Sequence, residues 1–332
     1  MRQKELGATG NRVSAIGLGC WGMSGSYGPA DETESVATLH HALDVGINFI
    51  DTADSYGDDG HNESLIGRSL AGRRHEFVLA TKTGWVKRAM PDGSTTIGVD
   101  GRPERIRSAC EASLSRLKTE AIDVYYLHRV DPDVPVEDSI GAMAELVTAG
   151  KVRFLGLSEV SEPTLRKAHA VHPITALQSE YSLWTREPEA TVMPACRELK
   201  IAFVPFSPLG RGFLTGAVKA KESITPGDWR ATNPRFTGEN LTRNLALLEP
   251  LEEIARSHGK SIAQVALAWV VSRGENVIPL PGMKRRSHLD ENVSAIEIDL
   301  SNEEKARLEA TFIPGAAAGD RYTPDVARWA GR

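Results

Sequence analysis

The sequence predicts an α/β fold in which eight parallel strands, each followed by a helix or loop, close into a (β/α)8 TIM barrel. Short runs rich in Val, Ile and Phe recur eight times, and amphipathic helical patterns lie between most of them. The runs are apolar on both faces, as is typical of strands buried in a parallel sheet. Polar residues also stand at the C-terminal ends of several runs, and in a barrel these ends meet at one mouth.

The predicted elements follow one another along most of the chain. The expected strands are Val13–Cys20, Ile47–Asp51, Phe77–Lys82, Ile122–His128, Val152–Ser158, Ile174–Gln178, Ile201–Phe206 and Asn276–Leu280. The expected helices are Asp31–Asp44, Pro103–Lys118, Asp138–Ala149, Glu162–Ala170, Glu187–Leu199 and Leu241–His258, with boundaries set by acidic starts, proline in a first turn and glycine after the last turn. An open, doubly wound sheet has the same local pattern, but the strand count and the polar strand ends favour the barrel.

Two segments lie outside this alternation. Residues Gly210–Asn240 are rich in Gly, Pro, Asn and Trp, which predicts a loop that folds over the mouth. The tail Pro314–Arg332 is rich in Ala and Gly and is either a second cover or a loose end. Because barrels of about 200 to 400 residues form one domain, residues 1–332 are expected to be a single domain.

Charge and cysteine content limit the partners. The formal net charge of −5 excludes a broadly basic nucleic-acid binder, and charge gives no reason to expect a membrane partner. No apolar run is long enough for a membrane helix. Cys20, Cys110 and Cys196 are far apart and have no zinc-site spacing, so we expect a cytoplasmic protein without a metal centre or disulfide framework. The sequence leaves the oligomeric state open.

One glycine pattern is misleading. Gly17, Gly19 and Gly22 match G-x-G-x-x-G after a predicted strand, which is the spacing of a dinucleotide fingerprint. Such a fingerprint opens directly into a helix, whereas here Met23–Ala30 intervenes with Pro29 inside it. The pattern therefore favours a flexible first loop at the mouth, or a loop in which Gly19–Trp21 backs a cofactor or substrate.

Four polar residues predict a catalytic cluster. Asp51, Lys82 and His128 each end a different apolar strand, and Tyr56 follows Asp51 by five residues. A lysine in such a place requires a partner or a lowered pKa, and Asp51 is the available carboxylate. Lys82 beside a phenol would lower the pKa of Tyr56, which could then donate a proton to a developing alkoxide, while His128 could polarise a carbonyl. Alone, each residue has an ordinary explanation as a turn cap, a surface lysine or a packing side chain.

These residues carry a resemblance to the aldo-keto reductase superfamily over nearly the whole chain. The segment Phe49–Gly57 (FIDTADSYG) resembles its first signature, and Thr81–Thr83 and Leu127–His128 match the segments with its lysine and histidine. Leu6–Gly7 with Val13–Gly22 resembles its first hairpin and barrel strand, so the resemblance implies an N-terminal β-hairpin cap and extra C-terminal helices and loops. It also implies a catalytic set, namely Asp51, Tyr56, Lys82 and His128.

The resemblance further implies a nicotinamide cofactor. Ser158, Glu159 and Gln178 match the carboxamide contacts, although Glu159 stands where the family usually has an asparagine, and a carboxylate cannot donate as an amide does. Phe206 matches the ring that stacks under the nicotinamide. The other implied cofactor contacts are Gly19, Cys20, Trp21, Asp51, Ser207, Pro208, Leu209, Gly210, Arg211 and Gly212.

The segment Ile278–Val293 resembles the part of the family that holds the adenosine phosphate. It implies cofactor contacts from Gly282, Lys284, Arg285, His288, Glu291 and Asn292, with His288 where many members have arginine. The residues agree with this, because Lys284–Arg286 precedes an expected helix that Ser287 would cap, and cations beside a helix N-terminus form an anion site. NADP(H) is therefore the expected cofactor, although a solvated basic turn has the same sequence.

We therefore expect an NADPH-dependent oxidoreductase that reduces small-molecule aldehyde or ketone carbonyls. A nicotinamide-binding regulatory subunit like the potassium-channel β subunits and a Schiff-base lyase that uses Lys82 are the alternatives. The expected substrate pocket contains Trp21, Tyr27, Tyr56, Trp85 and His128. Trp184, Phe213 and Trp229 could also line it, and core packing explains each of these aromatic residues equally well.

Overall fold

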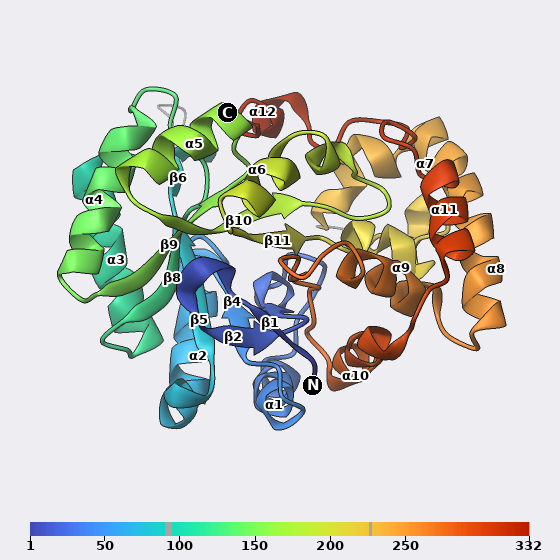
Figure 1. The fold of residues 1–332 in the computed structure, drawn as a ribbon, viewed down its shortest axis with the longest axis horizontal. Helices are drawn as coiled ribbons and strands as arrows, with labels where there is room; N and C mark the ends of the chain where they lie inside the picture. Colours follow the sequence, from blue (N-terminus) through green and yellow to red (C-terminus); the bar gives the residue numbers. More distant parts are fainter. Residues whose placement is uncertain (90–94, 226–227, 332) are drawn as a thin grey trace.

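The barrel strands are largely those that the sequence predicts. The computed structural model describes residues 1–89, 95–225 and 228–331. Within this part of the chain, seven parallel strands form a sheet in the order β11-β10-β9-β8-β5-β4-β3. They are β3 (Leu18–Gly19), β4 (Phe49–Asp51), β5 (Val78–Thr83), β8 (Ile122–Leu127), β9 (Val152–Ser158), β10 (Ile174–Glu180) and β11 (Ala202–Phe206), and Figure 1 shows helices on their outer side.

The eighth predicted strand closes the barrel without forming a regular ladder. The backbone N–H groups of Ile278 and Leu280 donate to the carbonyls of β11 at 2.9 and 2.8 Å. On the other side, Gly17 and Gly19 donate to the carbonyls of Pro279 and Pro281 at 2.9 and 3.1 Å. A proline has no N–H to give, so Pro279 and Pro281 can only accept bonds on the side of β3, and the next N–H on that side, from Met283, donates to the Gly19 carbonyl at 3.4 Å. Pairing along this segment is therefore reduced to isolated bridges.

The prediction of one strand over Val13–Cys20 is wrong. The chain forms an antiparallel hairpin of β1 (Gln3–Glu5) and β2 (Arg12–Ser14), and β3 enters the barrel only at Leu18. Between them, the Ala15 N–H donates to the carbonyl of Arg2 at 2.8 Å, so the backbone is still tied to the hairpin there. The expected N-terminal hairpin cap is confirmed, and Leu6 and Val13 pack against the barrel interior.

Side chains from alternating strand positions fill the barrel interior. The buried cluster inside it consists of Leu6, Val13, Phe49, Ala80, Val124, Tyr126, Ala176, Ala202, Val204, Ile278 and Leu280. A Cβ on Gly156 would lie 2.4 Å from the Tyr126 ring, so a glycine on β9 is what admits this large side chain. The hairpin covers one end of this packed core, and the polar strand ends lie at the other.

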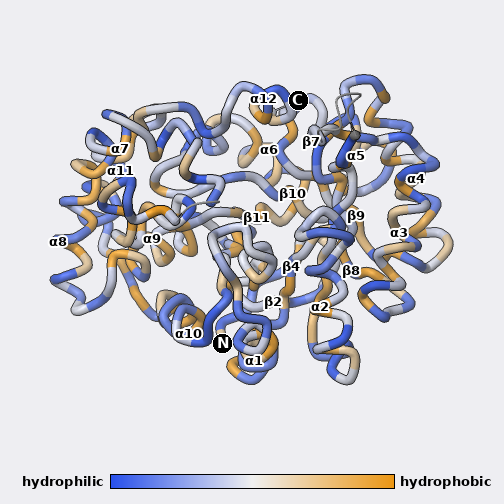
Figure 2. Tube along the Cα trace, turned by 180° about the vertical axis from the view of Figure 1, so that it is seen from behind, coloured by the Kyte–Doolittle hydropathy of each residue, from blue (hydrophilic) through white to orange (hydrophobic). Residues whose placement is uncertain are grey.

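Most predicted helices are present within a few residues of their expected bounds. They are α1 (Glu32–Asp44), α3 (Pro103–Leu117), α4 (Val136–Thr148) and α5 (Glu162–Val171). The expected helix Glu187–Leu199 is shorter, as α6 (Val192–Glu198), and Leu241–His258 is divided into α7 (Gly238–Leu245) and α8 (Glu249–Ser257) by a 3-10 turn. In Figure 2, α3, α4 and α8 alternate between hydrophobic and hydrophilic along their turns, as helices that cover a sheet do.

Several elements were not predicted. They are α2 (His61–Leu70), α9 (Ile262–Val271), α11 (Asn302–Thr311), the four-residue helix α12 (Pro324–Ala327), and a hairpin of β6 (Trp85–Ala89) and β7 (Thr95–Val99). Helix α9 is buried on nearly all sides, so its sequence lacks the period of an amphipathic helix. In the described residues, none of the helices has the length and hydropathy needed to span a membrane.

Both irregular segments lie at the mouth. Residues 210–225 and 228–236 form a series of 3-10 turns, and residues 226–227 of the predicted covering loop lie outside the described residues. The tail is held in place as well, because the Arg321 guanidinium pairs with Glu159 and the Gly331 N–H donates to the Glu159 carbonyl at 2.8 Å. The tail is therefore a second cover rather than a loose end.

Candidate active site

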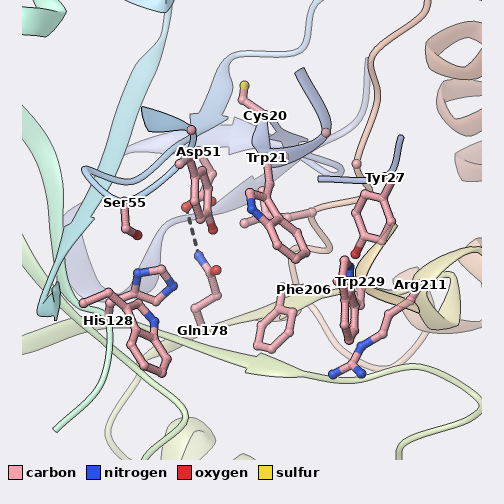
Figure 3. Close-up of a pocket in the computed structure, with 18 of the residues that line it drawn as sticks. Cys20, Trp21, Tyr27, Asp51, Ser55, His128, Gln178, Phe206, Arg211 and Trp229 are labelled. Carbon is pink, nitrogen blue, oxygen red and sulfur yellow. Dashed lines mark hydrogen bonds between the residues drawn. The ribbon is translucent and has the colours of Figure 1, made fainter. Parts of the chain in front are cut away.

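The structure brings Asp51, Tyr56 and Lys82 into contact. The Lys82 side chain is fully buried, and its Nζ donates to Asp51 Oδ1 at 2.5 Å, to the Thr52 carbonyl at 2.7 Å and to the Tyr56 hydroxyl at 3.2 Å. Gln178 donates from Nε2 to the other Asp51 oxygen at 2.9 Å, as the dashed line in Figure 3 shows. Strands β4, β5 and β10 end at the same mouth, which is why these residues meet.

Burial and charge act against each other in this cluster. Burial raises the pKa of Tyr56, and although Lys82 opposes this, the net pKa lies above the ordinary value. The expectation that Lys82 would give Tyr56 a lowered pKa is therefore wrong in net direction, because desolvation outweighs the neighbouring charge. Burial lowers the pKa of Lys82, but Asp51 and Tyr56 together raise it above its usual value. Tyr56 is thus a protonated hydroxyl that accepts a bond from an ammonium group.

His128 lies across from Tyr56. The two ring centroids are 5.9 Å apart at an angle of 75°, and the Trp85 ring lies 6.1 Å from His128 on another side. Burial lowers the pKa of His128 well below its usual value, and the charges of Lys82 and Arg129 lower it further. The imidazole is therefore neutral at pH 7, a state in which it can donate one hydrogen bond without carrying charge.

A cavity of about 1410 Å³ extends from this cluster. Tyr56, His128, Trp85, Trp21 and Tyr27 all line it, and Figure 3 shows His128 and Gln178 on one side with Tyr27, Trp229 and Arg211 on the other. The other predicted residues that line it are Gly19, Cys20, Asp51, Ser158, Phe206, Ser207, Pro208, Leu209, Gly212, Gly282, Lys284, His288, Glu291 and Asn292. Four predicted residues do not line it, namely Lys82, Glu159, Gly210 and Arg285.

The chain after β11 forms a backbone that suits an anion. Ser207, Gly210, Arg211 and Gly212 all have positive φ, from 49° to 91°, and three of them line the cavity. Positive φ costs energy at Ser207 and Arg211, and such strain concentrates at functional sites. The N–H groups of Gly210 and Gly212 donate to the carbonyls of Ser207 and Leu209 at 2.9 and 3.1 Å, so any anion contact in this turn would come from the N–H groups between them. With the Phe206 ring in the same wall, this cavity fits a dinucleotide that has one flat ring and a pyrophosphate.

The expected phosphate site is less cationic than the sequence suggests. Lys284 Nζ donates to the carbonyls of Tyr27 at 3.0 Å and Pro29 at 2.8 Å, which ties it to the first loop. Arg286 is the first residue of α10 (Arg286–Ser294), and it pairs with Glu34 at 2.9 Å. The expected cap at Ser287 is wrong, since the N-cap position is Arg285, two residues earlier, and it has no side-chain cap.

Glu159 holds the tail and does not line the cavity. Its carboxylate accepts hydrogen bonds from both terminal nitrogens of Arg321, at 3.2 and 2.7 Å, and from the backbone N–H of Glu180, at 2.7 Å. Burial raises the pKa of Glu159, but Arg321 and Arg129 outweigh this and lower it below its usual value. This ion pair brings Tyr322 of the tail to the cavity wall, where its ring lies 4.7 Å from the Arg211 guanidinium.

The variant Glu159→Gln is expected to lose about 1–3 kcal/mol of stability and to loosen the tail, because a neutral amide removes the ion pair at 2.7 Å and leaves Arg321 only its longer contact with Glu180 at 3.7 Å. Trypsin cleavage after Arg321 and urea unfolding measure the effect. The Glu159 pKa is lowered on folding, so this stabilisation is present above its ordinary pKa and disappears as pH falls through the folded value. Glu239→Gln, which removes a surface pair, is the control and should change little. Equal trypsin sensitivity in the two variants would contradict the role of Glu159.

Aromatic residues cover the mouth. Trp21 lies 5.1 Å from Tyr27 and 6.1 Å from Trp229, so the first loop and the long insertion meet there. Trp184 and Phe213 instead stack on each other at 4.0 Å in the buried core and do not line the cavity. Sequence reasoning missed other lining residues, above all Arg129, Asp54, Arg230, Asn233, Thr323 and Val326. A signal existed for Arg129, since a second polar residue follows His128 directly at the end of β8.

Known proteins share both the sequence and the fold. The model of the aldo/keto reductase family matches residues 15–312. A probable aldo-keto reductase 1 from Glycine max is 44% identical over 320 residues, which cover 96% of this chain and 91% of that protein.

Solved structures agree with this assignment. The glycerol dehydrogenase from Gluconobacter oxydans has a TM-score of 0.85 at 29% identity and covers 97% of this chain and 98% of its own. A thermostable aldo-keto reductase in complex with the inhibitor epalrestat has a TM-score of 0.74 at 32% identity, over 94% of this chain and 100% of its own. The chain therefore belongs to the aldo/keto reductase family, and it is an oxidoreductase with a (β/α)8 barrel.

Proposed function

We propose that this protein is an NADPH-dependent reductase of aldehyde and ketone carbonyls in which Tyr56 is the general acid. One observation carries the proposal. The Lys82 ammonium contacts the Asp51 carboxylate and the Tyr56 hydroxyl together, and Tyr56 lines the cavity while Lys82 is buried behind it. A hydroxyl that accepts a bond from an ammonium group can release its own proton toward the cavity, because the positive charge stabilises the phenolate that remains.

Each residue of the cluster has a separate role in this proposal. When bound, the nicotinamide supplies the hydride that the carbonyl carbon accepts. Tyr56 protonates the carbonyl oxygen, and Lys82 stabilises the resulting phenolate. Asp51 holds the Lys82 ammonium in place, and Gln178 in turn donates to the second oxygen of Asp51. Neutral His128 donates a hydrogen bond to the same carbonyl oxygen, which orients the substrate and polarises it.

The cofactor assignment rests on two groups of residues that line the cavity. Phe206, Ser158 and Gln178 suit a flat ring with a carboxamide, and Lys284 and His288 add basic side chains to the same lining. Arg285 is exposed at the start of α10, in a separate shallow hollow with Arg286. Lys284 and Arg285 are the cations offered to a 2′-phosphate, since Arg286 already has Glu34 as its partner.

The double variant Lys284→Ala/Arg285→Ala is therefore expected to weaken NADPH binding by about 10- to 100-fold, with a much smaller effect on NADH, because charge-assisted bonds to the phosphate are lost. Fluorescence titration with both cofactors measures this. Arg286→Ala is the matched control, because it removes a cation of the same turn that is already paired with Glu34. If NADPH and NADH weaken equally, neither residue reads the phosphate.

A panel of aldehydes and ketones, followed by loss of NADPH absorbance, tests the proposed reaction. We expect turnover with NADPH. Cofactor binding without turnover would instead indicate a regulatory subunit.

A Schiff-base lyase is disfavoured, because that chemistry requires a neutral lysine that substrate can reach, whereas Lys82 is fully buried and its pKa is raised despite burial. Borohydride trapping of substrate without nicotinamide would support the lyase.

The proposal includes a cytoplasmic location, which the free buried Cys20, Cys110 and Cys196 support.

A further inference from the structure

Arg129 is fixed in the wall of the cavity beside the catalytic cluster. It follows His128 at the end of β8, is 5% exposed and lines the cavity. Its Nη1 donates to the His128 carbonyl at 2.6 Å and to the Ser158 hydroxyl at 3.1 Å. The guanidinium lies 5.5 Å from the centre of the Trp85 ring. Three contacts therefore hold this side chain in one place.

The buried charges around Arg129 are already paired among themselves. Asp51 pairs with Lys82 at 2.5 Å, and Gln178 takes the second oxygen of Asp51. Glu159 directly follows β9 and Glu180 is the last residue of β10, and each of these buried carboxylates pairs with an arginine, at 2.7 and 2.5 Å. Among the residues that the structure describes, no carboxylate is within ion-pair distance of Arg129.

One edge of the guanidinium is also free of hydrogen bonds. Both bonds of Arg129 come from Nη1, and its Nε is buried without a hydrogen-bond partner in the described part of the chain. The edge formed by Nε and Nη2 is the one that binds a carboxylate through two parallel bonds. A buried cation with an unfilled donor is costly unless a ligand completes it.

We propose that Arg129 binds a carboxylate of the substrate, so that the preferred substrates are oxo acids, compounds that carry an aldehyde or ketone and a carboxylate. This inference rests on the proposed reductase function. Arg129 adjoins His128, the residue that would orient the carbonyl, and both residues line the same cavity. A carboxylate there would be held while the carbonyl oxygen faces Tyr56 and His128.

The test compares linear ω-oxo carboxylates of about two to six carbons with the corresponding primary amides, which have nearly the same shape without the charge. For wild type we expect at least one acid to have a kcat/KM about 10- to 100-fold above that of its amide, mainly through KM. In Arg129→Gln this preference should disappear, because kcat/KM should fall about 10- to 100-fold more for the acids than for the amides. Arg129→Lys keeps the charge without the two-pronged edge and should retain part of the preference.

The matched control is Arg230→Gln, because Arg230 lines the same cavity but is paired with Asp228 at 2.5 Å. This variant should change acids and amides by the same factor. Each variant is also titrated with NADPH. If Arg129 contacted the nicotinamide carboxamide rather than the substrate, Arg129→Gln would weaken NADPH binding. If Arg129→Gln lowers kcat/KM equally for both substrate types, or weakens NADPH binding while the acid preference persists, the inference is wrong.

Calorimetric titration of the same acids and amides separates this inference from the proposed function. Binding of acids to wild type but not to Arg129→Gln, without any turnover, would support the carboxylate site and end the reductase proposal. Turnover of acids and amides alike in wild type would end the inference and leave the reductase standing. A failure of wild type to bind or reduce the acids better than the amides overturns the role of Arg129 whether or not the variants fold.

Discussion

The variant Tyr56→Phe should reduce kcat for carbonyl reduction by about 1000-fold, the loss expected when a well-placed general acid is removed. The phenyl ring stays, so the cavity keeps its shape and NADPH binding should remain nearly unchanged. The Asp51–Lys82 pair also stays, because Tyr56 supplies only one of the three acceptors of Lys82 Nζ. Steady-state rates and fluorescence titration on the same preparation measure both expectations.

Tyr125→Phe is the control for this change. Tyr125 is a fully buried tyrosine on β8 that belongs to the cluster packed outside the barrel strands and does not line the cavity. Its loss should leave kcat nearly unchanged. If Tyr56→Phe retained wild-type turnover, the proton would come from another group and the assignment of the acid would be wrong.

The variant Lys82→Met should lose catalysis and also about 3–5 kcal/mol of stability, because it leaves the Asp51 carboxylate buried without its cation. Burial already raises the pKa of Asp51, and Lys82 and Gln178 oppose this. Without Lys82 the folded state should therefore hold a proton on Asp51 that the unfolded state releases. Urea unfolding measured across pH tests this.

The sign of the pH dependence follows from that proton. A folded state that binds more protons than the unfolded state loses stability as pH rises above the ordinary pKa of the carboxyl group. The deficit of Lys82→Met should therefore grow from acid toward neutral pH. Lys4→Met is the control, because Lys4 is another buried lysine, but its bonds go to the carbonyls of Val271, Gly274 and Val277, and it forms no ion pair with a carboxylate of the described residues. Lys4→Met should lower stability without removing catalysis. If Lys82→Met lost the same amount of stability at all pH values, the account would be contradicted.

The barrel and its mouth could be predicted from the sequence because both depend on local patterns. Buried parallel strands are short apolar runs, and a polar residue at the end of such a run can be recognised in the sequence. That is why Asp51, Lys82 and His128 could be placed at one mouth before any coordinates. Pro279 and Pro281 are also visible in the sequence. Their effect on the last strand depends on which neighbouring strand they face, because that side of the segment then lacks backbone N–H donors.

Features set by contacts between distant segments could not be predicted. The sequence does not show that Glu159 pairs with Arg321, 162 residues away, or that Lys284 is tied to the carbonyls of the first loop. The pKa of Tyr56 was misjudged for the same reason, since burial is a property of the folded chain. Arg129 shows the limit most clearly, because its importance lies in the absence of a partner among the described residues, which requires the positions of all neighbouring carboxylates.

A crystal structure of the protein grown with NADP⁺ tests the central claim most directly, namely that the cavity beside Asp51, Tyr56, Lys82 and His128 holds a nicotinamide dinucleotide. The account predicts electron density for the dinucleotide along this cavity, with the nicotinamide near Phe206 and the adenosine phosphate near Lys284. Density for the cofactor elsewhere, or none at a saturating concentration, would contradict it.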